Sequence, residues 1–253
     1  MKTAKIDLHL HLDGSLYLPW AYETAIKRGI VPSEYTFEEY YERYYQKNFK
    51  DRTESIKKFD FPVSILQTKE DISDAVYYLV RTLHEQEMIY AEIRFATQQH
   101  TQCGLTQKEA MLAAIDGMHR AEKDFPDVII RLINCMMHKG EDAHANYEAN
   151  LETIEVVREL MGQGVVGLDL AGYENNGDFL LYAPLFEKAR EYHIPYTMHA
   201  GEMGIGKHVL DALEMKAHRI GHGVNAVQNE SYLKAVVDSQ IPLEVCPSSN
   251  TKY

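Results

Sequence analysis

Short runs of β-branched and apolar residues alternate along the chain with longer stretches of helical periodicity. Apolar residues at helical spacing predict helices over Thr106–Phe125 and Asn146–Met161. The apolar runs predict seven strands, at Ala4–Leu10, Ile89–Phe95, Val128–Cys135, Val165–Leu170, Pro195–His199, Arg219–His222 and Ile241–Cys246. Strand–helix alternation of this kind indicates an α/β protein with a parallel sheet, most simply a (β/α)8 TIM-type barrel. We find no eighth strand before the sequence ends at Tyr253, so we expect a barrel that lacks strand 8 in this chain.

The stretch Leu16–Gln67 interrupts the alternation, because it has the pattern of several helices with no strand among them. One interpretation is a helical subdomain whose own core is packed by tyrosines, namely Tyr40, Tyr41, Tyr44 and Tyr45. A second interpretation is a lid, since the loops that follow barrel strands surround the active site. Both interpretations are open. We therefore expect one barrel domain over residues 1–253 with a lid-like helical insertion at about residues 16–67.

Composition narrows the class of protein. The 253 residues match the length of one barrel of about 250 residues, but the helical insertion takes up much of residues 16–67, so we expect the barrel to be one strand–helix unit short. The 45% hydrophobic and 25% charged residues are typical of a globular chain. The 26 basic and 38 acidic residues give a formal charge of −12, which disfavours nucleic acid and anionic membrane surfaces as partners.

Cysteine usage and hydropathy address the compartment. Cys103, Cys135 and Cys246 are far apart in the sequence and form neither a disulfide framework nor a CxxC pair. We find no secretory signal and no apolar run long enough to span a membrane. A cytoplasmic location is the expectation, and the oligomeric state is left open.

The candidate chemistry lies in the histidines that end three predicted strands. The first strand ends in His9-Leu10-His11, and residues two apart on a strand point to the same face, so both imidazoles can reach one metal ion. The fifth strand ends at His199, with Glu202 in the loop after it, and the sixth ends at His222. Each histidine taken singly is equally compatible with packing or a hydrogen-bonded core position. Together, at the rim where barrel active sites lie, they indicate metal chemistry with a non-ligand glutamate for proton transfer.

Other residues give weaker signals. Asp169 and Gly172 lie at the end of the fourth strand, and Gly172 can equally be a turn glycine. Eight further histidines are expected on helices or loops, most of them at the surface or at helix ends: His84, His100, His119, His138, His144, His193, His208 and His218. Neither a GxxxxGK[ST] loop nor a GxGxxG motif occurs.

Six sequence blocks together resemble the adenosine deaminase family of the metal-dependent amidohydrolases. They are KIDLHLHLDGS, YAEIRFA, VVGLDLAG, TMHAGE, RIGHGV and CPSSN, and they occur in family order over essentially the whole chain. The resemblance implies a hydrolase of purine metabolism that converts adenosine to inosine and ammonia with one zinc ion. Its partner would be a small purine nucleoside.

The resemblance also assigns roles by position. It implies that His9, His11 and His199 bind the zinc ion. It implies that Glu202 protonates the purine ring nitrogen and that His222 orients the metal-bound water. By the same resemblance, Gly172 offers its backbone to the purine, and Asp13 holds the sugar hydroxyl.

Two positions depart from the family pattern. Tyr173 stands where the family usually has an acidic residue. The family also has an aspartate pair at the end of its eighth strand, one of them a zinc ligand, and the sequence after Cys246 offers no such pair. Two alternatives to an adenosine deaminase therefore stay open. One is a deaminase of adenine, AMP or another aminopurine, and the other is an inactive or truncated family member that binds purine.

Overall fold

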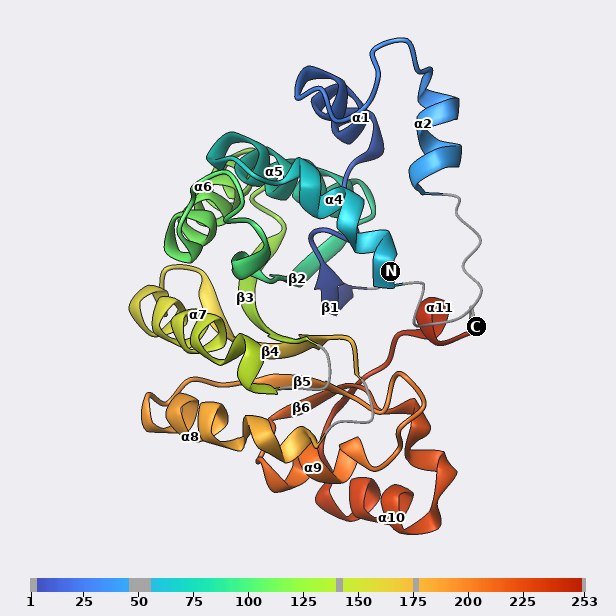
Figure 1. Ribbon diagram of the computed structural model, residues 1–253, viewed down its shortest axis with the longest axis vertical. Helices are drawn as coiled ribbons and strands as arrows, with labels where there is room; N and C mark the ends of the chain where they lie inside the picture. Colours follow the sequence, from blue (N-terminus) through green and yellow to red (C-terminus); the bar gives the residue numbers. More distant parts are fainter. Residues whose placement is uncertain (1–3, 46–55, 140–142, 175–177, 252–253) are drawn as a thin grey trace. The chain divides into compact units, whose positions relative to one another are not determined.

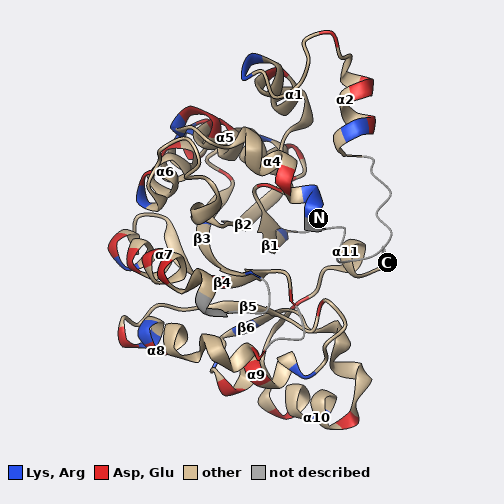
Figure 2. Ribbon diagram, viewed as in Figure 1, with Lys and Arg blue, Asp and Glu red and all other residues tan. Residues whose placement is uncertain are grey.

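The computed structural model describes residues 4–45, 56–139, 143–174 and 178–251, and Figure 1 shows the helices and strands. The fold is α/β, as the alternation predicts. Contacts between Cα atoms divide the chain into two compact units, Met1–Leu132 and Ile133–Tyr253. Strand β3 (Ile129–His138) crosses the boundary between them. Charged residues are carried mainly by the helices (Figure 2).

The first unit contains two parallel strands, β1 (Lys5–His11) and β2 (Met88–Phe95). The described residues between these strands contain helices and no strand, as the pattern of residues 16–67 predicts. Residues 46–55 lie outside the described part. These helices are α1 (Leu18–Lys27), α2 (Phe37–Tyr44), η1 (Ile56–Phe59), α4 (Asp60–Ile65) and α5 (Lys69–Glu85). After β2 come η2 (Thr97–Gln99) and α6 (Gln107–Asp124).

Threonine side chains fix where three of these helices begin. Thr36 and Thr106 each form a capping box, with Glu39 and Glu109 respectively, at the start of α2 and α6. Thr68 accepts a hydrogen bond from the backbone of Asp71 at the start of α5. Such a cap supplies an acceptor to backbone N–H groups that have no partner within the helix.

The tyrosines of the insertion do pack together in the described residues. Tyr40 is fully buried, and its ring lies 5.3 Å from that of Tyr22 and 5.7 Å from that of Phe61. Tyr44 stacks on Phe61 at 4.0 Å, and Tyr41, Tyr44 and Tyr45 are half-buried. Tyr40 therefore forms the centre of this cluster, and the other three predicted tyrosines lie around it.

The second unit contains the remaining strands, β4 (Val165–Gly172), β5 (Thr197–Ala200), β6 (Arg219–His222) and β7 (Leu243–Glu244). β6 lies between β5 and β7 and pairs parallel with both. A parallel bridge from Leu168 to Tyr196 connects β4 with the start of β5. The helices are η3 (Ala143–Asn146), α7 (Tyr147–Leu160), η4 (Phe179–Tyr182), α8 (Ala183–Glu191), α9 (His208–Glu214), η5 (Val224–Gln228), α10 (Glu230–Ser239) and α11 (Pro247–Asn250).

The predicted strand positions are confirmed, with differences at their ends. β3 runs to His138, three residues beyond the prediction. β7 is shorter than predicted and contains only Leu243 and Glu244. Of the described residues, no helix is both long and apolar enough to cross a membrane.

Three of the other histidines differ from the surface or helix-end positions expected for most of them. His100, His138 and His208 are buried. His138 ends a strand rather than lying on a helix or loop. Burial of an imidazole depends on its tertiary contacts, and sequence spacing does not reveal those contacts.

His100 shows the cost of such burial. Its Nδ1 lies 2.8 Å from the carbonyl oxygen of Leu66, which joins the end of η2 to the end of α4. Burial lowers the pKa of His100 from 6.5 to about 4 because the charged imidazolium is poorly solvated in the core. The folded chain therefore keeps His100 neutral at pH values where the unfolded chain protonates it.

We predict that this histidine makes the protein less stable in mild acid. Stability is lost as the pH falls below 6.5, because only the unfolded state binds the proton, and the loss stops near pH 4. When the pH is lowered from 7 to 5, the free energy of unfolding should fall in both proteins, and the fall should be about 2 kcal/mol smaller in His100→Gln than in the unsubstituted protein. Urea unfolding at the two pH values measures this difference. His119→Gln, at an exposed position on α6, is the control, and equal slopes for both variants would contradict the assignment.

Candidate active site

The end of β1 carries two imidazoles side by side. His9 and His11 have ring centroids 5.3 Å apart, and each offers a ring nitrogen within 4.8 Å of the other's. The backbone N–H of His9 donates to the Asp7 carboxylate at 2.8 Å. This bond holds the backbone of β1 at the position from which the His9 side chain extends. This spacing is short enough for both rings to bind one ion.

Asp13 follows the pair and is buried. The Leu12 N–H donates to the Arg94 carbonyl at 2.9 Å, and the Arg94 guanidinium donates to the Leu8 carbonyl, so β2 holds the chain on both sides of the histidines. Burial raises the pKa of the Asp13 carboxyl to about 7. Within the described residues, Oδ1 of Asp13 has no hydrogen-bond partner. A buried oxygen of this kind is a suitable acceptor for a ligand hydroxyl.

His199, on β5 in the second unit, is oriented by a buried carboxylate. Its Nδ1 lies 2.9 Å from Oδ2 and 3.1 Å from Oδ1 of Asp169, which is fully buried on β4. Cys135 Sγ on β3 lies 3.6 Å from Oδ2 of the same carboxylate. Since Nδ1–H donates to Asp169, the lone pair of His199 is on Nε2, the arrangement usual for a metal-binding histidine. An imidazole whose Nε2 lone pair is available in this way is a donor that a zinc-type ion accepts.

Glu202 and His222 lie close to His199 in the second unit. His222 Nε2 lies 3.5 Å from Oε2 of Glu202, and the His222 ring centroid is 5.2 Å from that of His199. On its other side, His222 Nδ1 lies 3.0 Å from the side-chain nitrogen of Asn250 at the end of α11. His222 has a positive φ of 67°, which is uncommon for a residue with a side chain and is typical of functional sites. A carboxyl and an imidazole so placed can exchange protons with a common ligand.

Gly172 ends β4 in a conformation that requires glycine. Its φ is +111°, and a Cβ atom there would lie 2.6 Å from the carbonyl oxygen of His138. The residue is half-buried. The positive φ and the close approach of the His138 carbonyl explain structurally why this position is a glycine.

The predicted residues thus fall into two groups. The first unit brings together His9, His11 and Asp13 at the end of β1. The second unit brings together His199, Glu202 and His222 at the ends of β5 and β6. Gly172 ends β4 in the same unit.

Sequence reasoning missed two residues of the second group, Glu174 and Asn250. Glu174 follows β4 and is buried, and Asn250 contacts His222. The position of Asp169 in the sequence indicates no role for it. An aspartate within the apolar run VVGLDLAG was the available signal, because a carboxylate in a buried strand needs a specific donor.

Comparison with known proteins identifies the family. The sequence profile described as "Adenosine deaminase" matches residues 4–253. The chain belongs to the adenosine deaminase family. An adenosine deaminase of Haemophilus ducreyi is 39% identical over 250 residues, covering 97% of this chain and 71% of the relative.

Solved structures agree with this family assignment. An adenine deaminase from Arthrobacter aurescens matches with a TM-score of 0.83 at 25% identity, covering 98% of this chain and 73% of that one. An Arabidopsis N6-mAMP deaminase matches with the same TM-score of 0.83, also at 25% identity, with coverages of 98% and 73%. The fold shared with these deaminases confirms the predicted TIM-type class, and the family resemblance read from the six sequence blocks is also confirmed.

The glycine at the end of β4 gives a test of the site's framework in this family member. Gly172→Ala should destabilise the fold by at least about 3 kcal/mol, because the new Cβ meets the His138 carbonyl and the backbone strain adds to the clash. Gly162→Ala is the matched control, since Gly162 also has a positive φ of 81° but nothing within 4 Å of its Cβ position. There we expect about 1 kcal/mol from strain alone. Urea unfolding compares the two, and equal losses would disprove the steric account.

Proposed function

We propose that the chain is a zinc-dependent adenosine deaminase that converts adenosine and water to inosine and ammonia. One observation carries this proposal: Asp169 orients the imidazole of His199, and the carboxyl of Glu202 lies next to the imidazole of His222. Membership of the adenosine deaminase family supports it. In the reaction, the bond from C6 of the purine to its amino nitrogen breaks, and a bond from C6 to the oxygen of water forms.

We assign His9, His11 and His199 as the ligands of one divalent ion. The Asp169 carboxylate leaves Nε2 of His199 available as a ligand atom. When bound, a zinc ion supplies the Lewis acidity that makes water nucleophilic near neutral pH.

Glu202 and His222 have different roles in the reaction. Glu202 donates a proton to the ring nitrogen beside C6, which draws electrons from C6 and favours attack. His222 would orient the attacking water. The 3.5 Å separation of Nε2 from Oε2 of Glu202 supports this division, because both groups can reach neighbouring atoms of one substrate.

Asp13 and Gly172 are assigned to substrate binding. The buried Oδ1 of Asp13 would accept a hydrogen bond from a sugar hydroxyl, which relieves the cost of leaving it without a donor. The backbone of Gly172 would contact the purine ring. The helical insertion after β1 is proposed to cover the bound nucleoside, with residues 46–55 outside the described part.

The second candidate is a deaminase of a related aminopurine. The solved relatives named for adenine and N6-mAMP support keeping it. Asp13 favours the nucleoside, because a free base has no sugar hydroxyl to donate to its carboxylate. Comparing adenosine, adenine and AMP as substrates separates the candidates.

Cysteine chemistry supports a reducing compartment. Cys103, Cys135 and Cys246 form no disulfide in the described residues. We propose a cytoplasmic location on this basis.

The zinc-loaded chain should release inosine and ammonia from adenosine. Glu202→Ala should retain zinc and lose about 100- to 10,000-fold in kcat, because the proton donor is absent while the ligands remain. Metal analysis and an inosine assay measure the two properties. Glu214→Ala, at an exposed position on α9, is the control and should match the unsubstituted enzyme. Absence of inosine from the metal-loaded chain would refute the function, and loss of zinc with activity would mean that Glu202 is structural.

Asp169→Asn should weaken zinc binding about 10- to 100-fold, because the amide no longer fixes the imidazole tautomer of His199. Competition with a chromophoric chelator measures the affinity. Asp211→Asn is the matched control, since Asp211 is also a buried carboxylate of this unit but pairs with Lys207. An unchanged affinity in Asp169→Asn would argue against His199 as a ligand.

A further inference from the structure

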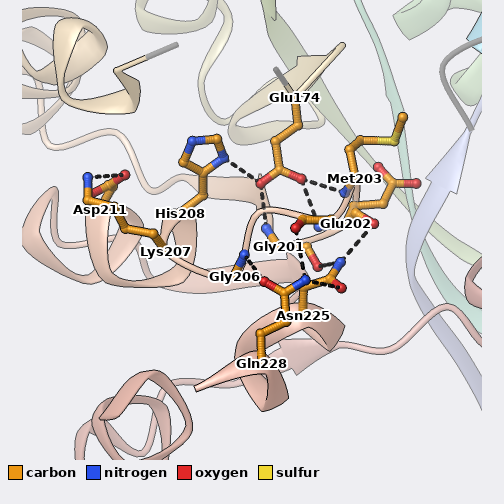
Figure 3. A network of polar contacts seen from close by, with 11 residues as sticks. Glu174, Gly201, Glu202, Met203, Gly206, Lys207, His208, Asp211, Asn225 and Gln228 are labelled. Atoms are coloured by element: carbon orange, nitrogen blue, oxygen red, sulfur yellow. Dashed lines mark hydrogen bonds and ion pairs between the residues drawn. The ribbon is translucent and has the colours of Figure 1, made fainter. Parts of the chain in front are cut away.

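A buried carboxylate grips the loop that carries Glu202. Oε1 of Glu174 accepts from the backbone N–H of Gly201 at 2.6 Å, and Oε2 accepts from those of Glu202 at 2.8 Å and Met203 at 2.7 Å (Figure 3). His208 Nδ1 lies 2.7 Å from the same Oε1. Both carboxylate oxygens therefore have two partners each.

Three consecutive N–H groups that converge on one anion form a concave backbone site. Such convergence requires a sharp turn, and Gly201 supplies it with a φ of +68°. Charged acceptors make the strongest hydrogen bonds to backbone N–H groups, so the carboxylate of Glu174 holds this turn more firmly than a neutral side chain can.

The carbonyl groups of the same loop are held by amide side chains. The Asn225 side-chain nitrogen donates to the Gly201 carbonyl at 2.8 Å and to the Glu202 carbonyl at 3.0 Å. Further along, Gln228 donates to the Gly204 carbonyl at 2.8 Å and accepts from the Gly206 N–H at 3.0 Å. Figure 3 shows both amides on the opposite side of the loop from Glu174. The peptide groups on both sides of the Glu202 Cα are thus fixed.

Glu174 is itself supported by His208. The imidazole stacks on Phe179 with ring centroids 4.4 Å apart and planes 11° apart. Both side chains of the Glu174–His208 pair are buried. A packed ring that contacts the carboxylate restricts its rotamers, which makes Glu174 a rigid support.

We propose that Glu174 is a positioning residue that sets the place of the Glu202 carboxyl relative to His222. This inference rests on the proposed function, in which Glu202 donates a proton to the purine. The side chain of Glu202 lies 3.5 Å from His222, while its own N–H and C=O are bonded to Glu174 and Asn225. Displacement of this backbone moves the proton donor away from the reacting atoms.

Glutamine at position 174 tests the charge without changing the shape. In Glu174→Gln, an NH2 group replaces either Oε1 or Oε2. Backbone N–H groups donate to both of these oxygens, so the NH2 group would face a donor where the carboxylate offers an acceptor. The loop must therefore shift to separate the donors. We expect Glu174→Gln to lower kcat about 10- to 100-fold with little change in KM, since a displacement of about 1 Å can cost that much.

Two measurements decide the inference. Hydrogen exchange should be at least about tenfold faster at the amides of Gly201, Glu202 and Met203 in Glu174→Gln, with zinc content retained. In a Glu202→Ala background, single-turnover kinetics should show almost no further loss from Glu174→Gln, because Glu174 acts through Glu202.

Asp71→Asn is the matched control: Asp71 is a buried carboxylate of the first unit that pairs with Arg28, and its substitution should leave kcat unchanged.

Each contrary result overturns the inference. Unchanged exchange at residues 201–203 would show that Glu174 does not anchor the loop. An equal loss of kcat in both backgrounds would show that Glu174 acts independently of Glu202. If the unsubstituted, zinc-loaded chain forms no inosine, the proposed function fails, and the exchange measurement still reports separately on the anchoring.

Discussion

Two buried carboxylates near the carboxyl end of β4 impose the constraint on which the second unit's candidate site depends. A carboxylate out of water must be surrounded by donors, or its charge is prohibitively costly. Asp169 meets this requirement with the imidazole of His199, and Glu174 meets it with three backbone N–H groups and His208. The donors come from β5, the loop after it and α9, so satisfying the charges also fixes the strand end and the loop that carry the chemistry.

The parallel strands explain why these groups can meet. β5 and β6 pair with His199 opposite Gly221 and Ala200 opposite His222, so His199 and His222 lie near the ends of neighbouring strands. The loop after β5 then has only to turn at Gly201 to bring Glu202 next to His222. Short connections from rigid strands position such side chains more accurately than long loops do. Strand geometry also explains the His9–His11 pair, because residues two apart at the end of β1 point to the same face.

The sequence was sufficient for the strand–helix order and for the residues at strand ends, because periodicity and strand-end position report both directly. It was insufficient where a role depends on partners distant in the chain. Glu174 resembles a solvated loop acid until its bonds to residues 201–203 are known. The burial of His100, His138 and His208 is not predictable from the sequence for the same reason, since burial of an imidazole depends on tertiary contacts. Strand ends shifted by a few residues because pairing, not local pattern, decides where a strand stops.

The zinc-site assignment can be tested directly by crystallography. Diffraction data collected from zinc-loaded crystals at the zinc absorption edge would locate the ion by anomalous scattering. The account predicts one strong peak bound by His9, His11 and Nε2 of His199, with Nδ1 of His199 still hydrogen-bonded to Asp169. A peak elsewhere, or one that His199 reaches through Nδ1 after release from Asp169, would contradict it.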